Sequence, residues 1–320
     1  MTEPFFFYKE INKNNAVMKN PYYYSASDYY KDVFGEKVYK ISLDAGCTCP
    51  TRDGTKGTRG CIFCSSSGSG DFAANRNKSI TDQITDAKLL VSKKIKSQNP
   101  KYIAYFQNFT NTYGDTNTLI AKYNEALQDP TIVGISIATR PDSISDSILY
   151  EIGELAKKTY VSIELGLQTI HPKSSTFIRR GYDLSEYTLA MNRIKAISSK
   201  IHIVTHIIFG LPSETTEEML DTVRFCVNSK TDGIKIALLH VLKGTDLEPL
   251  YKAGQCKCMT LEEYLPLICS AVKIIPKTIV IHRLTGDGPK SLLIAPLWTA
   301  DKKNVQNQIN LYFSNDLKST

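Results

Sequence analysis

The most distinctive chemical feature of this 320-residue sequence is a group of four cysteines in one short stretch. Cys47, Cys49, Cys61 and Cys64 lie in CTCPTRDGTKGTRGCIFC, directly after a predicted strand. Cys61 and Cys64 have C-x-x-C spacing, which allows two thiolates to bind one metal centre. Glycines between Cys49 and Cys61 give the loop the backbone freedom to bring Cys49 back to the same centre. The spacing therefore predicts a metal site built from three or four thiolates.

Two kinds of metal centre accept these ligands. With Cys49, Cys61 and Cys64 alone, a [4Fe–4S] cluster keeps one iron without a protein ligand. That open iron is what S-adenosylmethionine (SAM) chelates in radical SAM chemistry. All four cysteines, or three with a histidine, would instead suit a structural zinc ion. A zinc ribbon is usually a small module of its own, whereas this loop follows a strand of a larger array, so its position favours the cluster.

Strand-length apolar runs alternate with helical patterns along most of the chain, which predicts successive βαβ units and a parallel sheet. The fold class that we expect is α/β, a partial or complete TIM-like barrel whose chemistry gathers at the C-terminal ends of the strands. The predicted strands are 38–44, 101–106, 132–138, 160–165, 201–209, 233–241 and 278–284. The predicted helices are 79–96, 117–127, 145–157, 184–198, 216–229 and 261–274.

Both ends of the chain fall outside this alternation. We expect an aromatic N-terminal arm at residues 1–36, the barrel domain at residues 37–300 and a helical C-terminal tail at residues 301–320. The aromatic side chains of the arm predict either packing on the barrel, the more common role, or stacking on nucleobases. The tail has the apolar spacing of one amphipathic helix, which we expect to cap the open edge of the barrel.

Composition limits the function classes only broadly. No apolar run is long enough to cross a bilayer, and the start MTEPFFFYKE lacks the features of a secretion signal, so a cytoplasmic location is expected. In a reducing compartment, eight cysteines indicate metal or redox chemistry and not a disulfide framework. The net charge of +7 is compatible with a polyanionic partner such as RNA but does not by itself indicate one.

The cysteine stretch and its surroundings closely resemble a known family. Residues 43–74, LDAGCTCPTRDGTKGTRGCIFCSSSGSGDFA, resemble the YhcC/YtqA group of radical SAM proteins, which is related to the radical SAM domain of Elp3. The likeness continues through SIATRPD, ELGLQT, HIIFGLPSE and HRLTGDGPKSLLIAPLW, so it spans residues from about 34 to 310. It implies a radical SAM barrel in which Cys49, Cys61 and Cys64 ligate the cluster. Cys47 stands where relatives usually carry Phe, so we do not count it as a ligand.

The resemblance also implies contacts with SAM. Gln107, Thr110 and Asn111 follow the second predicted strand, where radical SAM proteins usually bind the methionine amino group. Arg140 and Asp142 follow the third predicted strand. They are expected either to meet the ribose or carboxylate of SAM, or to cap and salt-bridge the next helix.

Further candidates lie in or after the fourth predicted strand. Glu164 is a carboxylate inside an apolar strand, where it needs a ligand or a cation as partner, and we expect SAM to be that partner. Gln168 and Arg180 are additional candidates for binding the amino-acid part of SAM. Three histidines in or after predicted strands are expected either in the core or lining a substrate pocket: His206, His240 and His282.

As a function, the resemblance implies an enzyme that cleaves SAM to a 5′-deoxyadenosyl radical and acts on the C5 side chain of a wobble uridine, as tRNA-modification enzymes of the MnmL type do. The partners implied are tRNA and an electron donor such as flavodoxin or ferredoxin. Two alternatives stay open. One is the same radical chemistry on a small-molecule substrate, and the other is a non-catalytic zinc-binding protein whose barrel only scaffolds RNA or protein contacts.

Overall fold

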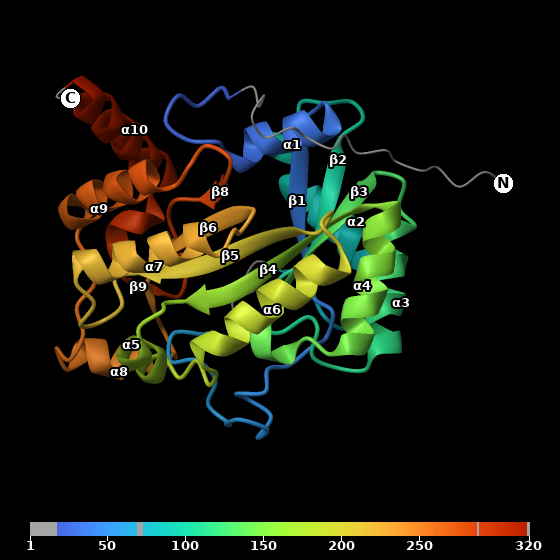
Figure 1. Cartoon of the computed structure of the whole chain (residues 1–320), viewed down its shortest axis with the longest axis horizontal. Coiled ribbons are helices and arrows are strands. Elements are labelled where there is room, and N and C mark those ends of the chain that lie inside the picture. The colour runs from blue at the N-terminus through green and yellow to red at the C-terminus, as the bar shows by residue number, and fades with distance from the viewer. Residues whose placement is uncertain (1–17, 69–72, 287, 319–320) are drawn as a thin grey trace.

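The computed structural model describes residues 18–68, 73–286 and 288–318, and its centre is a parallel sheet that curls into a half-barrel (Figure 1). Each strand pairs in parallel with its neighbours, and β1 and β8 form the two edges of this sheet. The strands in spatial order are β1 (Val38–Leu43), β2 (Lys101–Phe106), β3 (Ile132–Thr139), β4 (Tyr160–Gln168), β5 (His202–Phe209), β6 (Gly233–Leu238) and β8 (Val280–Arg283). The predicted fold class is confirmed as a partial TIM-like barrel.

Helices between consecutive strands cover the outer face of the sheet, and the main hydrophobic core lies between the two layers. These helices are α2 (Ile80–Val91), α3 (Thr116–Leu127), α4 (Asp146–Lys158), α6 (Leu184–Ile197), α7 (Thr216–Asn228) and α9 (Leu261–Ile274). Most begin at a Ser, Thr or Asp whose side chain accepts a backbone N–H of the first turn. Thr215 and Thr260 form complete capping boxes with Glu218 and Glu263.

The structure differs from the sequence prediction mainly at the ends of elements. Helix α2 ends at Val91 and not at residue 96, because the following SKKIKS offers too few apolar side chains to continue its buried face. Strand β6 ends at Leu238, after which the chain turns into a short antiparallel pair. The elements that sequence patterns missed are all short: α1 (Ala26–Phe34), α5 (Pro172–Phe177), β7 (Val241–Leu242), α8 (Leu247–Lys252) and β9 (Leu293–Ala295).

The described aromatic residues of the N-terminal segment pack inside the molecule. Helix α1 lies across the end of the half-barrel where β1 and β2 begin (Figure 1). Tyr24 is fully buried, and its carbonyl accepts the N–H of Ile281 at 2.8 Å. The ring of Tyr29 stacks on His202, with 4.5 Å between ring centroids. The remaining aromatic residues of the expected arm, Phe5, Phe6, Phe7 and Tyr8, lie outside the described residues.

Helix α10 (Lys302–Lys318) forms the expected C-terminal tail and packs against α9. Its buried side chains are Val305, Ile309 and Phe313, and the ring of Phe313 lies 5.0 Å from that of Tyr22. The backbone near Tyr22 and helix α10 therefore lie side by side. In the part of the chain that the structure describes, no helix combines the length and apolar character that a membrane span requires. The boundaries of the three expected segments stay predictions.

The close contact of Gly134 in β3 with the backbone of β4 gives a stability prediction. A Cβ atom on Gly134 in β3 would lie 2.5 Å from the carbonyl oxygen of Tyr160 in β4. We expect Gly134→Ala to lower the free energy of unfolding by about 1–3 kcal/mol, because the backbone must shift to admit the methyl group. Chemical denaturation measures this change. Gly57→Ala is the matched control, since its Cβ would lie 3.4 Å from the Thr51 carbonyl, and equal stability of the two variants would contradict the prediction.

Candidate active site

A cavity of about 850 Å³ lies inside the half-barrel and reaches the C-terminal ends of the strands. Its lining comes from the cysteine loop after β1 and from each strand of the large sheet. Nine of the eleven site residues predicted from the sequence line it: Cys49, Cys61, Cys64, Gln107, Thr110, Arg140, Glu164, Gln168 and Arg180. Asn111 and Asp142 do not. The fold therefore brings together side chains that are far apart in the sequence.

Backbone hydrogen bonds fold the cysteine loop back on itself. The N–H of Gly60 donates to the carbonyl of Thr51 at 2.8 Å, and the N–H of Lys56 donates to that of Pro50 at 2.7 Å. Gly60 has φ = +70°, and a Cβ atom there would lie 2.7 Å from Nε of Arg52. The Arg52 guanidinium in turn donates to the carbonyl of Ser65 at 2.6 Å. These contacts hold the backbone around Cys49 and the backbone around Cys61 and Cys64 in one compact loop, as the glycine spacing predicted.

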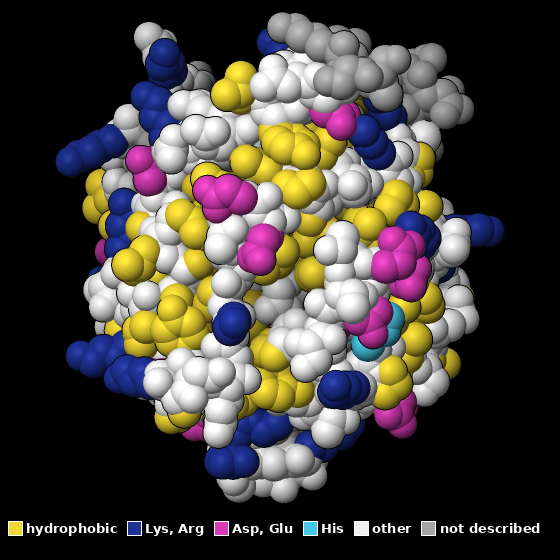
Figure 2. Space-filling view, turned by 90° about the vertical axis from the view of Figure 1, so that its left-hand side faces the viewer, with side chains coloured by type: hydrophobic (Ala, Val, Ile, Leu, Met, Phe, Trp, Pro, Cys, Tyr) yellow, Lys and Arg dark blue, Asp and Glu magenta, His cyan; other side chains and the backbone are white. Residues whose placement is uncertain are grey.

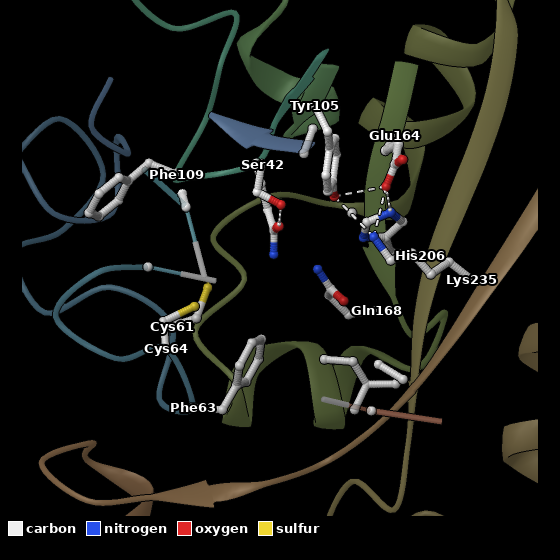
Figure 3. A pocket seen from close by; sticks show the side chains of 18 of the residues that line it. Ser42, Cys61, Phe63, Cys64, Tyr105, Phe109, Glu164, Gln168, His206 and Lys235 are labelled. Carbon is white, nitrogen blue, oxygen red and sulfur yellow. Dashed lines mark hydrogen bonds and ion pairs between the residues drawn. The ribbon is translucent and has the colours of Figure 1, made fainter. Parts of the chain in front are cut away.

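Three of the four cysteines in the loop face the cavity. The Cys49 sulfur lies 3.0 Å from Oγ1 of Thr110, and the Cys61 thiol donates to the Arg179 carbonyl at 3.9 Å. A hydrogen bond with Cys64 lowers the pKa of Cys61, and the nearby guanidinium groups of Arg140 and Arg52 lower it further. Figure 3 shows the sulfurs of Cys61 and Cys64 side by side at one wall of the cavity.

Cys47 lies apart from these three. It is buried in the main hydrophobic core and does not line the cavity. Burial raises the pKa of its thiol to about 12. The position of Cys47 agrees with our reading that it is not a ligand.

The three cavity cysteines suit an iron–sulfur cluster. A cubane cluster offers a different iron to each thiolate, so its ligands need to line one pocket and need not converge on one point. Among the described residues, no three His, Cys, Asp or Glu side chains are grouped closely enough to hold one metal ion. The guanidinium groups of Arg52 and Arg140 near Cys61 also suit the negative charge that a cluster with three thiolates carries.

The polar residues that follow β2 and β3 have mixed surroundings. The Gln107 side chain accepts a hydrogen bond from Ser42 at 3.0 Å and lines the cavity beside Thr110. Asn111 turns inward instead, where its amide donates to the carbonyls of Phe106 and Ala138, both at 2.9 Å. This position of Asn111 gives no support to its predicted contact with SAM, which stays a prediction.

Arg140 and Asp142 form a salt bridge with each other, as one expectation had it, but they do not cap the next helix, because Ser145 is the N-cap of α4. The Nε and Nη2 atoms of Arg140 donate hydrogen bonds to the carboxylate of Asp142, at 3.0 and 2.8 Å. The ammonium group of Lys56, in the cysteine loop, pairs with the same carboxylate at 2.6 Å. Asp142 therefore ties the loop to the end of β3, while Arg140 still lines the cavity. Arg180 is held by the carbonyls of Tyr182, Leu167 and Thr169 at the end of β4.

Among the described residues, three of the five non-glycine residues with positive φ lie in or beside the cavity wall. Phe109, Gln168 and Arg179 have φ values of 58°, 67° and 57°, which side-chain-bearing residues rarely adopt. Phe109 and Gln168 line the cavity, and the carbonyl of Arg179 accepts the Cys61 thiol. Gln168 stands at a bulge between β4 and β5, which directs its amide into the cavity (Figure 3). Such strain clusters at functional sites.

Glu164 is at the centre of a polar group that we call the Glu164 cluster: Glu164, Lys40, Lys235, His206, Tyr105 and Ser136. One carboxylate oxygen accepts from Lys40 and, at 2.8 Å, from Ser136. The other accepts from Lys235 at 2.9 Å, from Tyr105 at 2.9 Å and pairs with His206 at 2.6 Å. Figure 3 shows Glu164, Tyr105, His206 and Lys235 across the cavity from the cysteine sulfurs.

The Glu164 cluster fixes the charges of its members. Burial raises the pKa of Glu164, but the ammonium groups of Lys235 and Lys40 outweigh it and hold that pKa well below its usual range. Burial and the neighbouring Arg283 lower the pKa of Lys235 to about 8. Burial and Lys235 lower the pKa of His206 to about 4, so its imidazole is neutral at pH 7. Glu164 thus has the cation partners that a buried carboxylate requires, and its contact with SAM stays a prediction.

The histidines divide between two places. His206 and His240 line the cavity, which is one of the two places expected for them. His282 lies instead beside His202, with 3.0 Å between their Nε2 atoms, near the aromatic side chains of α1. His282 is half-buried there and does not line the cavity.

Sequence reasoning missed several side chains of the cavity wall, chiefly Lys40, Tyr105 and Lys235. Each of the two lysines is a single charged residue within an otherwise apolar strand, VYKISL and GIKIAL. That is the same signal that singled out Glu164, since a buried charge needs a partner of opposite sign. Applied to Lys40, Glu164 and Lys235, that signal would have predicted that each charge has a partner, although not which strands supply it.

The comparisons with known proteins agree with this geometry. The Radical SAM superfamily pattern matches residues 54–226, and the Radical SAM C-terminal domain matches residues 231–314. Over 307 residues, the chain is 40% identical to the uncharacterized protein YtqA of Bacillus subtilis. The matched region covers 93% of this chain and 94% of that protein. The protein is a radical SAM enzyme of the YhcC/YtqA group. Members of this superfamily use a [4Fe–4S] cluster and SAM, and this chain does so too.

More distant relatives extend the YhcC/YtqA group towards Elp3. Over 176 residues, the chain is 28% identical to a protein of Methanocaldococcus jannaschii named tRNA uridine(34) acetyltransferase. The matched region covers 54% of this chain and 31% of that protein. The structure resembles that of Elp3 from Methanocaldococcus infernus with a TM-score of 0.61 and 18% identity, over 83% of this chain and 63% of that one. This likeness in structure shows a shared fold.

The ligand assignment can be tested one cysteine at a time. We expect Cys49→Ala, Cys61→Ala and Cys64→Ala each to lose the cluster, because each thiolate binds one iron and the buried Cys47 does not face the cavity. Cys47→Ala is the matched control and should keep it. Iron and sulfide content and visible absorption of anaerobically reconstituted protein measure the outcome. A cluster that survives loss of Cys61 but not of Cys47 would overturn the assignment.

Glu164→Gln should destabilise the protein, because it leaves two ammonium groups in the half-barrel without their carboxylate. Breaking a buried ion pair from one side costs about 3–5 kcal/mol. Tyr105→Phe is the control, since it removes one hydroxyl contact and no charge. Denaturation measures both, and SAM binding to the folded Glu164→Gln protein separately tests the predicted contact with SAM. Wild-type stability of Glu164→Gln would contradict the role given to the Glu164 cluster.

Proposed function

We propose that this enzyme modifies the C5 side chain of the wobble uridine in tRNA by radical SAM chemistry. The observation that carries the proposal is the likeness, over half of the chain, to a protein named for its action on uridine 34 of tRNA. Two features of the protein support a polyanionic substrate. The chain has a net charge of +7, and the cysteine loop carries exposed basic side chains such as Arg59, which is 74% exposed.

These basic side chains belong to the loop that carries the cavity cysteines. The cysteine loop forms the lower end of the molecule in Figure 1, and Figure 2 shows Lys and Arg side chains along the same lower edge. Phosphate contacts there would position the tRNA without reading its sequence. The target base would then have to leave its stack to enter the half-barrel, as bases do in enzymes that act on them.

In this proposal the residues of the cavity have separate tasks. Cys49, Cys61 and Cys64 hold the cluster, which when bound supplies the electron that cleaves SAM to methionine and a 5′-deoxyadenosyl radical. Gln107, Thr110, Arg140, Gln168 and Arg180 bind the polar groups of SAM from the ends of β2, β3 and β4. The rings of Phe63 and Phe109 flank the cysteines in Figure 3 and exclude water from that wall. A flavodoxin or ferredoxin is the proposed electron donor.

The test incubates reduced enzyme and SAM with tRNA that carries 5-carboxymethylaminomethyluridine and examines the nucleosides by mass spectrometry. We expect the wobble nucleoside to change and 5′-deoxyadenosine to be released. Cys61→Ala is the control and should do neither, because it removes a cluster ligand. Binding of the tRNA should weaken steeply with added salt, since cations are released from its phosphates. An unchanged wobble uridine, together with deoxyadenosine release stimulated by a small metabolite, would replace tRNA by a small-molecule substrate.

A further inference from the structure

We propose that the inner end of the cavity binds a carboxylate group on the substrate through the ammonium groups of Lys235 and Lys40, with the guanidinium of Arg283 beside them. The identity of the molecule that carries this carboxylate rests on the proposed function. The site itself rests only on the charges and contacts of the Glu164 cluster.

The inner end of the cavity has an excess of positive charge. Among the described residues that line the cavity, Glu164 is the one acidic side chain, while Lys40, Lys235 and Arg283 lie around it. Lys235 and Lys40 are 14% and 23% exposed, and Glu164 is fully buried. The single carboxylate of Glu164 balances one of the two ammonium groups of Lys40 and Lys235. Both ammonium groups line the cavity and are only partly exposed, so the arrangement favours a second anion from outside the chain.

The existing contacts leave room for that anion. Each lysine ammonium has three N–H donors. Lys235 donates to Glu164 and, at 3.0 Å, to the Tyr105 hydroxyl, while Lys40 donates to Glu164 and, at 3.1 Å, to the Ser136 hydroxyl. Both carboxylate oxygens of Glu164 already accept several hydrogen bonds, so Glu164 cannot take up the remaining donors. A ligand carboxylate in the cavity would accept the third N–H of each lysine.

SAM does not supply this carboxylate. The open iron of a cluster held by Cys49, Cys61 and Cys64 would engage the carboxylate and amino group of SAM at that wall. Figure 3 shows Lys235 on the other side of the cavity from Cys61 and Cys64, with Ser42 and Gln168 between the two walls. Lys235 and Lys40 therefore face the part of the cavity beyond SAM. That is where the reacting group of the substrate would lie.

A carboxylate suits this position better than a nucleic-acid phosphate. The cations belong to the strands themselves, deep in the half-barrel, whereas the backbone phosphates of a tRNA stay at the mouth when one base enters. The C5 substituent of a uridine extends away from the ribose and the phosphates, so it is the part that reaches farthest inward. A substituent that ends in a carboxylate would place its reacting carbon between SAM and the lysines.

The first experiment compares two tRNA substrates that differ in this carboxylate. Reduced enzyme and SAM are given tRNA with 5-carboxymethylaminomethyluridine or the same tRNA with 5-methylaminomethyluridine, and KM and kcat for deoxyadenosine release are measured. A charged hydrogen bond contributes enough to raise KM about 10- to 100-fold when the carboxylate is missing. Lys235→Met should remove most of this difference, and Lys235→Arg should restore part of it. Lys101→Met, at a surface pair with Glu36, is the matched control and should behave as wild type.

The second experiment needs neither turnover nor tRNA. Calorimetry measures binding of the free nucleoside 5-carboxymethylaminomethyluridine, and of its neutral carboxamide, to wild-type enzyme loaded with SAM. The comparison of the two ligands does not depend on whether Lys235→Met folds. Tighter binding of the carboxylate, weakened in Lys235→Met, supports the site even if the tRNA is not modified, in which case only the proposed function fails. Equal binding of the two ligands, or tRNA turnover with equal KM for both substrates, would overturn the site.

Discussion

The buried carboxylate of Glu164 is the interaction on which the interior of this half-barrel depends. It stands on β4, in the middle of the sheet, and contacts Lys40 on β1, Tyr105 on β2, Ser136 on β3, His206 on β5 and Lys235 on β6. A half-barrel lacks the closing strand pair that would fix its curvature. Bonds from one carboxylate to five other strands provide that restraint from inside. The same arrangement requires charged side chains where an ordinary barrel packs apolar ones, so structure and chemistry share one group of residues.

The cavity consequently has two walls of different character. The cysteine loop forms one wall, and its shape comes from backbone hydrogen bonds, from Gly60 at positive φ and from Arg52 and Lys56, which tie it to Ser65 and Asp142. The Glu164 cluster forms the other. A reactive group generated at the first wall would meet a substrate held at the second, away from bulk water. In the proposed reaction, this separation gives SAM and substrate their own sets of partners.

Much of this could be predicted from the sequence because the signals are local. Strand and helix periods, the spacing of Cys49, Cys61 and Cys64, and polar residues at strand ends need only a short window of sequence, and the structure places most of them around one cavity. Pairings across the barrel could not be predicted in this way. Lys40 and Glu164 are 124 positions apart, and Lys235 is 71 positions from Glu164, so nothing local identifies them as partners. Asn111 also shows the limit, since its inward turn depends on the carbonyls of two strands.

The most direct test of the account follows a hydrogen atom from the substrate. The tRNA is prepared with deuterium on the carbon atoms of the C5 side chain of its wobble uridine and given to reduced enzyme with unlabelled SAM. If the radical formed at the cysteine wall acts on a side chain held at the Glu164 cluster, the released 5′-deoxyadenosine carries deuterium. Mass spectrometry detects that label. Deoxyadenosine that is released without deuterium, while the wobble uridine keeps all of its label, would contradict the account.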